Sequence, residues 1–162
     1  MNAAVTDNTV YQYNNHGIAM FFGDEIFDGS VFNATVTGNT VTSPGNLLND
    51  FNGIHLNNGT VAATDNFTSC VDIGGAGPLA NNIVGSGRGS TPPNNQQFRL
   101  RQRQSTTVRL PGYGGANNDN AAVVAFLQGR NTVTAGNGAA SNTVGSGGGG
   151  YVGGAACTQP SP

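Results

Sequence analysis

The chain has 162 residues, of which 36% are hydrophobic and 9% are charged; its formal net charge is -2, and it contains no lysine. This length fits one domain with a small core, and so low a net charge argues against disorder caused by self-repulsion. It also argues against nucleic acid and anionic membranes as partners, and no window approaches the roughly 20 apolar residues that a membrane helix needs.

Short apolar segments alternate with turn residues along the chain. They are separated by Gly, Asn, Asp and Pro, which supply turns and left-handed backbone positions. In chain order the segments are GIAMFF, SVFNATV, GIHL, CVDI, FRLRQR, TVRL and VVAFL. The last lies in AAVVAFLQGRNTV (121–133), which resembles a short helix, but Val123, Val124 and Phe126 favour strands and Gly129 ends the segment early. We interpret this segment as a strand and the chain as all-β.

Two phrases recur in the sequence, which predicts a repeat architecture. In the first phrase, an Asn follows a polar residue or Gly and precedes an apolar residue or Thr. It occurs as DNTV (7–10), GNTV (38–41), DNFT (65–68), NNIV (81–84), RNTV (130–133) and SNTV (141–144). In the second, HGIAM (16–20) recurs as NGIHL (52–56), with CVDIG, FRLRQ and VVAFL as later equivalents. The second phrase predicts one inward stack of Ile18, Ile54, Ile73, Leu100 and either Val124 or Phe126.

A parallel β-helix explains both phrases. One coil cannot bury its apolar side chains alone, but stacked coils align their strands in parallel and fill a narrow interior with Ile, Val, Leu and Phe. Asn suits the corners, because it tolerates left-handed backbone and because stacked Asn side chains can hydrogen-bond in a ladder. We therefore predict a single β-helix domain over residues 1–162, in which the Gly-rich residues 135–162 form a C-terminal cap or tail.

The phrases also resemble a known kind of protein. The GI-x-L and N-T-V phrasing resembles the right-handed parallel β-helix repeats of secreted and cell-surface bacterial proteins. Residues 98–132, FRLRQRQSTTVRLPGYGGANNDNAAVVAFLQGRNT, and the closing GGGGYVGGAACTQPSP resemble the C-terminal part of large bacterial β-strand-repeat surface proteins. The resemblance implies a right-handed, adhesin-like surface module, extracellular or at the bacterial cell surface, and carries over no catalytic residue. The coil length is irregular, and the chain is far shorter than such proteins.

The carboxylates do not form an obvious catalytic pattern. A β-helix hydrolase or lyase would place two or three carboxylates, or carboxylate-bound calcium, across a groove between neighbouring coils. The nearest cluster, Asp24, Glu25 and Asp28, lies within the single segment FFGDEIFDGS, and we interpret it as a solvated loop. Asp72 is interpreted as a turn or surface acid. We predict no catalytic residue and no cofactor.

The two histidines precede or interrupt the matching strands HGIAM and GIHL. Alternation along GIHL places Ile54 and Leu56 on one face and His55 on the other, so we expect His55 to point outward. A metal site would need further ligands, and no HxH or HxxxH spacing includes His16 or His55. We predict no metal site.

Arginines give the clearest candidate binding site. Arg99, Arg101 and Arg103 alternate along FRLRQR and therefore share one face of a strand, and Arg109 is a fourth candidate. The planar guanidinium fork suits the carboxylate or sulfate groups of an acidic polysaccharide. Two alternatives remain: a charged face that prevents wrong strand pairing, or partners for nearby acids. A binding module would place this face beside aromatic residues such as Tyr113.

The cysteines and the chain ends complete the predictions. Cys70 and Cys157 are far apart and form no metal or redox motif, so they either form a disulfide or leave Cys70 as a small buried side chain.

MNAAVTDNTVYQ begins with repeat-like strand and has no polar cap, so we expect upstream repeats or another copy of the chain to cover the N-terminal end.

Together these features predict a non-catalytic extracellular structural or adhesive module that assembles end to end. Head-to-tail stacking of copies does not close on itself and would give filaments. The alternative is a carbohydrate-active β-helix protein, either a polysaccharide lyase or hydrolase or a glycan-binding module.

Overall fold

The computed structural model describes residues 1–23, 31–46, 52–61, 64–89, 91–144 and 149–161. Within these residues the chain is rich in strands, which form three sheets. The five-stranded sheet has the order β1 (Asn2–Thr6), β4 (Val31–Thr37), β7 (Thr68–Ile73), β9 (Thr107–Arg109) and β11 (Gly150–Val152). The four-stranded sheet has the order β3 (His16–Phe22), β6 (Asn52–Asn58), β8 (Phe98–Gln104) and β10 (Ala139–Val144). The two-stranded sheet joins β2 (Thr9–Val10) to β5 (Thr40–Val41).

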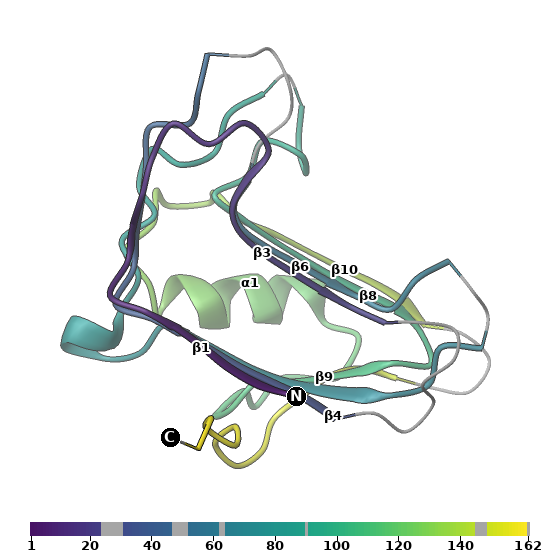
Figure 1. Cartoon of the computed structure of the whole chain (residues 1–162). Helices are drawn as coiled ribbons and strands as arrows, with labels where there is room; N and C mark the ends of the chain where they lie inside the picture. Colours follow the sequence, from purple (N-terminus) through teal and green to yellow (C-terminus); the bar gives the residue numbers. More distant parts are fainter. Residues whose placement is uncertain (24–30, 47–51, 62–63, 90, 145–148, 162) are drawn as a thin grey trace.

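All these strand pairs are parallel, and the chain visits the sheets in a fixed order. It passes from the five-stranded to the two-stranded to the four-stranded sheet and then repeats the circuit. Isolated parallel bridges at Asn82 and Thr132 continue the two-stranded sheet where the chain passes it again. Figure 1 looks along this stack, so the strands of each sheet lie almost behind one another. The predicted all-β class and parallel pairing are confirmed.

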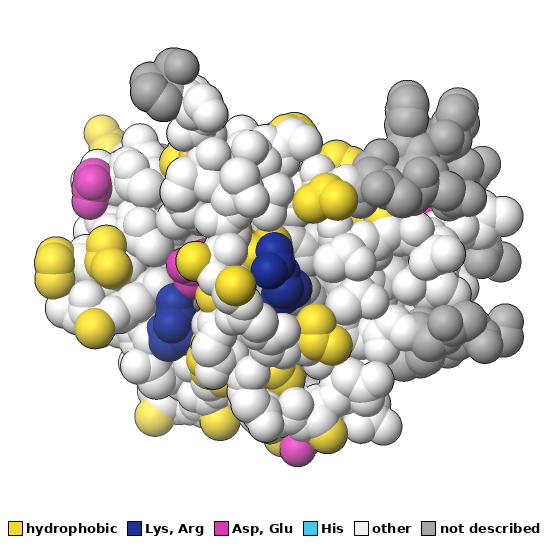
Figure 2. All heavy atoms as spheres, turned by 90° about the horizontal axis from the view of Figure 1, so that it is seen from below, with side chains coloured by type: hydrophobic (Ala, Val, Ile, Leu, Met, Phe, Trp, Pro, Cys, Tyr) yellow, Lys and Arg dark blue, Asp and Glu magenta, His cyan; other side chains and the backbone are white. Residues whose placement is uncertain are grey.

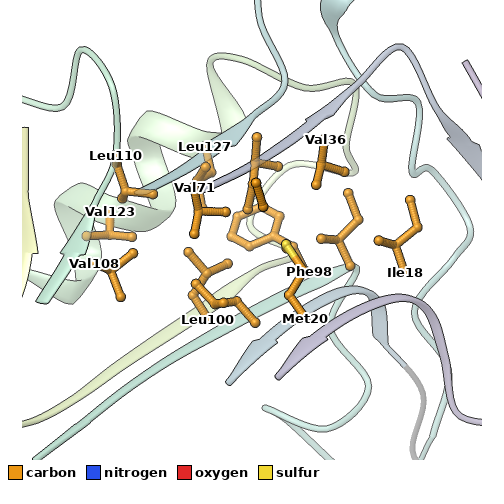
Figure 3. Close-up of a cluster of buried hydrophobic side chains, with 14 of the residues drawn as sticks. Ile18, Met20, Val36, Val71, Phe98, Leu100, Val108, Leu110, Val123 and Leu127 are labelled. Carbon is orange, nitrogen blue, oxygen red and sulfur yellow. The ribbon is translucent and has the colours of Figure 1, made fainter. Parts of the chain in front are cut away.

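The core lies between the sheets (Figure 3). Ile18, Ile54 and Phe98 occupy equivalent positions of β3, β6 and β8, and all three side chains are buried. Ile73 is also buried, as predicted, but it lies on β7 in register with Val36, in the five-stranded sheet. The predicted single stack is therefore two facing stacks, one from each larger sheet.

The segment predicted as a last strand is a helix, α1 (Asn120–Gln128). The Asp119 side chain caps it by accepting a hydrogen bond from Ala122 N at 2.9 Å. Val123 and Leu127, four residues apart, are buried in the core, whereas Phe126 is only partly buried. The cap and the i, i+4 apolar pair outweigh the strand preference of the β-branched residues. In the view of Figure 1, along the stack, α1 projects between the two larger sheets.

A ladder of asparagines lines the corner between the five-stranded and two-stranded sheets. Asn39 Oδ1 accepts from Asn8 Nδ2 at 3.1 Å, and Asn81 Oδ1 accepts from Asn39 Nδ2 at 2.9 Å. Asn131 Oδ1 accepts in turn from Asn81 Nδ2 at 2.8 Å. These four residues come from DNTV, GNTV, NNIV and RNTV, so four copies of the first phrase mark one corner. DNFT and SNTV lie elsewhere: DNFT leads into β7, and SNTV lies in β10.

The Gly-rich residues 135–162 include two strands and a terminal tail. β10 and β11 pair with β8 and β9, and the tail then crosses the outer face of the five-stranded sheet. A disulfide joins Cys157 to Cys70 on β7, and Thr158 N donates to Asn33 Oδ1 on β4 at 3.4 Å. The C-terminal tail therefore runs toward β1, the opposite end of the sheet from β11. Figure 2 views this side of the molecule, where few charged side chains are visible.

Candidate functional site

The outer face of the four-stranded sheet carries three of the predicted arginines. The inward-facing residues of β8 are buried, and Arg99, Arg101 and Arg103 alternate with them on the opposite face. The register aligns His55 with Arg99 and Asn57 with Arg101 across the neighbouring strand β6. The structure thus brings three of the four predicted arginines onto one surface.

Arg101 and Arg103 line a hollow of about 220 Å³ at the end of this surface. Thr60, Val61 and Gln104 complete its wall. Neither guanidinium forms a hydrogen bond or ion pair in the part of the chain that the structure describes. Arg99 differs, because its Nη1 donates to Asn94 Oδ1. Arg101 and Arg103 are therefore the two arginines of this face whose guanidinium groups have no partner among the described residues.

An aromatic stack lies beside the arginines. His55 lies on the outer face, as its alternation predicts, but it is only 3% exposed, because the His16 and Phe21 rings lie 4.2 and 5.4 Å from it. Burial, and after it neighbouring positive groups that include Arg99, lowers the pKa of His55 from 6.5 to about 3. Burial also lowers the pKa of His16. His55 is therefore neutral near pH 7, and the charge on this face comes from the arginines.

Arg109 and Tyr113 do not join this surface. Arg109 lies on β9 of the five-stranded sheet, and its Nη1 donates to Ala155 O in the C-terminal tail at 3.4 Å. Tyr113 packs edge-on against Phe126 at 5.6 Å, and its hydroxyl donates to Ala116 O at 2.9 Å. The prediction that Arg109 joins the face of the other arginines is wrong, because the chain passes from the four-stranded to the five-stranded sheet between Arg103 and Arg109.

Three of the described carboxylates, those of Asp65, Asp72 and Asp119, have structural partners. Asp72 forms an ion pair with Arg130 at 2.5 Å on the outer face of the five-stranded sheet, and Asp65 accepts a hydrogen bond from Thr60 N. The predicted loop cluster Asp24, Glu25 and Asp28 lies outside the described residues. Among the residues that are described, no group of three or more His, Cys, Asp or Glu side chains gathers as a metal site would require.

The N-terminal end of the stack is a second candidate surface. β1, β2 and β3 are the edge strands of the three sheets at this end, so one side of each strand is unpaired in the structure. A hollow of about 310 Å³ opens at this end between β1, β3 and β4. The described residues that line it have apolar side chains: Met1, Ala3, Val5, Ala19, Met20, Phe21, Phe22, Phe32 and Ala34. Met1 is 71% exposed and Phe21 is 62% exposed.

The two ends of the stack differ in how they are covered. α1 lies in the last circuit of the chain and buries Val123 and Leu127 against the core. The ladder also ends there, because Asn131 Nδ2 donates to Leu127 O, at the C-terminal turn of α1, at 2.9 Å. At the N-terminal end, Asn8 Oδ1 accepts no hydrogen bond from any described residue.

No protein-family model matches the chain, and neither the curated proteins nor the solved structures give a match. No described helix is both long and apolar enough to cross a membrane. The site must therefore be interpreted from its own geometry.

Sequence reasoning missed Phe21 as a member of the aromatic stack. Alternation along HGIAMFF places Phe21 on the same face as Ala19, and the match of HGIAM to NGIHL aligns Ala19 with His55. These two observations together would have placed Phe21 near His55. The apolar hollow left no comparable signal, because its lining comes from three separate strands.

Proposed function

We propose that the chain is a non-catalytic structural or adhesive module of an extracellular protein, and that it is a right-handed parallel β-helix. Three parallel sheets visited in a repeating order, with an Asn ladder at one corner, support the β-helix assignment. The disulfide between Cys70 and Cys157 favours an oxidising compartment, such as the outside of a cell.

One observation carries the proposed assembly: the N-terminal end combines an apolar hollow with three unpaired strand edges. Unpaired edges offer N–H and C=O groups to a further strand, and an exposed apolar patch marks a surface for association. The module associates through this end, with another copy or with a repeat of the same kind. The opposite end, where α1 lies across the core, is the less suitable surface.

The Asn ladder gives this end a direction. In each step, the side-chain oxygen of one Asn accepts from the amide of the Asn nearer the N-terminal end. A partner that continues the ladder must therefore present a donor to Asn8 Oδ1. Its strands would pair in parallel with β1 and β3, because all the strand pairs within the stack are parallel.

Light scattering across a concentration series tests the assembly. We expect the mass of the wild-type chain to rise with concentration. A lysine in the hollow, Ala3→Lys, should keep the chain monomeric, because the charge would be buried at the contact. The matched control Leu79→Lys places the same charge on an exposed residue of the 3-10 helix Gly77–Leu79 and should associate like the wild type. A wild-type chain that is monomeric at every concentration contradicts association with another copy.

A further inference from the structure

Arg101 and Arg103 carry positive charges that nothing in the described chain neutralises. They lie two residues apart on β8, so their side chains leave the same face about 6.6 Å apart along the strand. The ion pair that the described residues do form, between Asp72 and Arg130, lies on another sheet. Two like charges this close repel each other, and an anion bound near both would offset that repulsion.

The surroundings hold the two arginines in place and leave room in front of them. β8 is an inner strand, paired with β6 on one side and β10 on the other. Gly59 follows β6 and packs against the end of β8: a Cβ there would lie 3.0 Å from Arg103 O and from Thr106 Cγ2. The hollow in front of Arg103 opens toward the Thr60–Val61 segment.

Asn57 is the polar neighbour of Arg101 on this face. It pairs with Arg101 across β6 and β8, and its Oδ1 is buried without a hydrogen-bond partner. A buried acceptor of this kind normally has a partner, so its position beside two unpaired guanidinium groups requires an explanation. A ligand hydroxyl that donates to Asn57 Oδ1 would supply one, once the Asn57 side chain turns toward the hollow. Ser141, in the next position across the sheet, adds an exposed hydroxyl.

We propose that Arg101 and Arg103 bind the carboxylate or sulfate groups of an acidic polysaccharide. Each guanidinium fork fits one such group, and the neighbouring Asn57 accepts from a sugar hydroxyl. A polysaccharide is favoured over nucleic acid because the ligand offers hydroxyls as well as anions and because the disulfide indicates an extracellular setting. This site is on a side of the stack and does not depend on association through the N-terminal end.

Isothermal titration with a heparin hexasaccharide tests the proposal, using neutral dextran of similar length as the reference sugar. We expect the heparin oligosaccharide to bind and the dextran not to bind, with an affinity that falls as salt increases. Arg101→Gln and Arg103→Gln should each weaken binding about tenfold. Arg88→Gln is the matched control, because Arg88 is exposed, carries the same charge and bonds Gly45 O instead. It should bind like the wild type.

Three outcomes would overturn the proposal. They are no heparin binding, equal weakening by Arg88→Gln, and tighter binding of a single-stranded DNA oligomer of equal charge. Arg101→Lys guards against misfolding of the glutamine variants. It keeps the charge but loses the fork, so weaker heparin binding with an unchanged circular dichroism spectrum supports the proposal, whereas unchanged binding contradicts the role of the fork.

Discussion

The Asn ladder should contribute most to stability at its middle, and Asn81→Ala tests this. Asn81 is fully buried, and its Oδ1 accepts from Asn39 N at 3.0 Å and Asn39 Nδ2 at 2.9 Å. Its Nδ2 donates to Val36 O and to Asn131 Oδ1, each at 2.8 Å. Alanine removes all four hydrogen bonds and leaves the buried Asn39 N–H without an acceptor. At about 1 kcal/mol for each bond, the free energy of unfolding should fall by about 4 kcal/mol.

Asn8→Ala is the matched control, because it makes the same change at the open end of the ladder. Asn8 Nδ2 donates to Thr6 O and Asn39 Oδ1, and the side chain is exposed. The loss should be about 1 kcal/mol, since water can replace these partners. Urea unfolding followed by circular dichroism measures both changes. Equal losses for Asn81→Ala and Asn8→Ala would refute the idea that the buried ladder stabilises the stack.

Three further predictions concern other features. Replacing Cys157 by Ser removes the link to Cys70 across a sequence separation of 87 residues, and the loop-entropy model gives a loss of about 4.6 kcal/mol, measurable in urea. The pKa of His55 is lowered to about 3 in the folded chain, so between pH 6.5 and pH 3 the unfolded chain binds more protons than the folded chain. The free energy of unfolding should therefore fall as the pH is lowered from 6.5, by up to about 1.4 kcal/mol per pH unit. In His55→Gln the free energy of unfolding should fall less steeply. Asp119→Ala removes the cap of α1 and should lower stability by about 1 kcal/mol, whereas an unchanged melting temperature would show that packing alone holds the helix.

The sequence was most informative where one residue type has one structural use. Asn8, Asn39, Asn81 and Asn131 recur in similar phrases because each lies at the same corner and hydrogen-bonds to its neighbour in the ladder. Alternation also placed Ile54 inside and Arg101 outside. Such local rules do not identify the sheet to which a strand belongs. Ile73 and Arg109 were therefore assigned to the wrong sheet, although the alternation around them was correct.

Features that depend on distant contacts could not be predicted. α1 forms because Asp119 caps it and because the core accepts Val123 and Leu127, and neither condition is visible in the β-branched residues of the segment. The path of the C-terminal tail depends on Cys70, far away in the sequence. Of the candidate site, the arginine face was predicted from alternation, whereas the hollow depends on where Thr60 and Val61 turn after β6.

The disulfide determines how the folded chain would respond to mechanical tension at its C-terminus. A pull on the residues after Cys157 is transmitted through the covalent bond to Cys70 on β7, the central strand of the five-stranded sheet. β11 and β9, which precede the bond in the chain, are bypassed and are not peeled away first. The load instead reaches a strand hydrogen-bonded on both sides, to β4 and β9, so many bonds must yield together before the strand detaches. After reduction of the disulfide, the same pull would act on β11 first, and the strands would detach one after another.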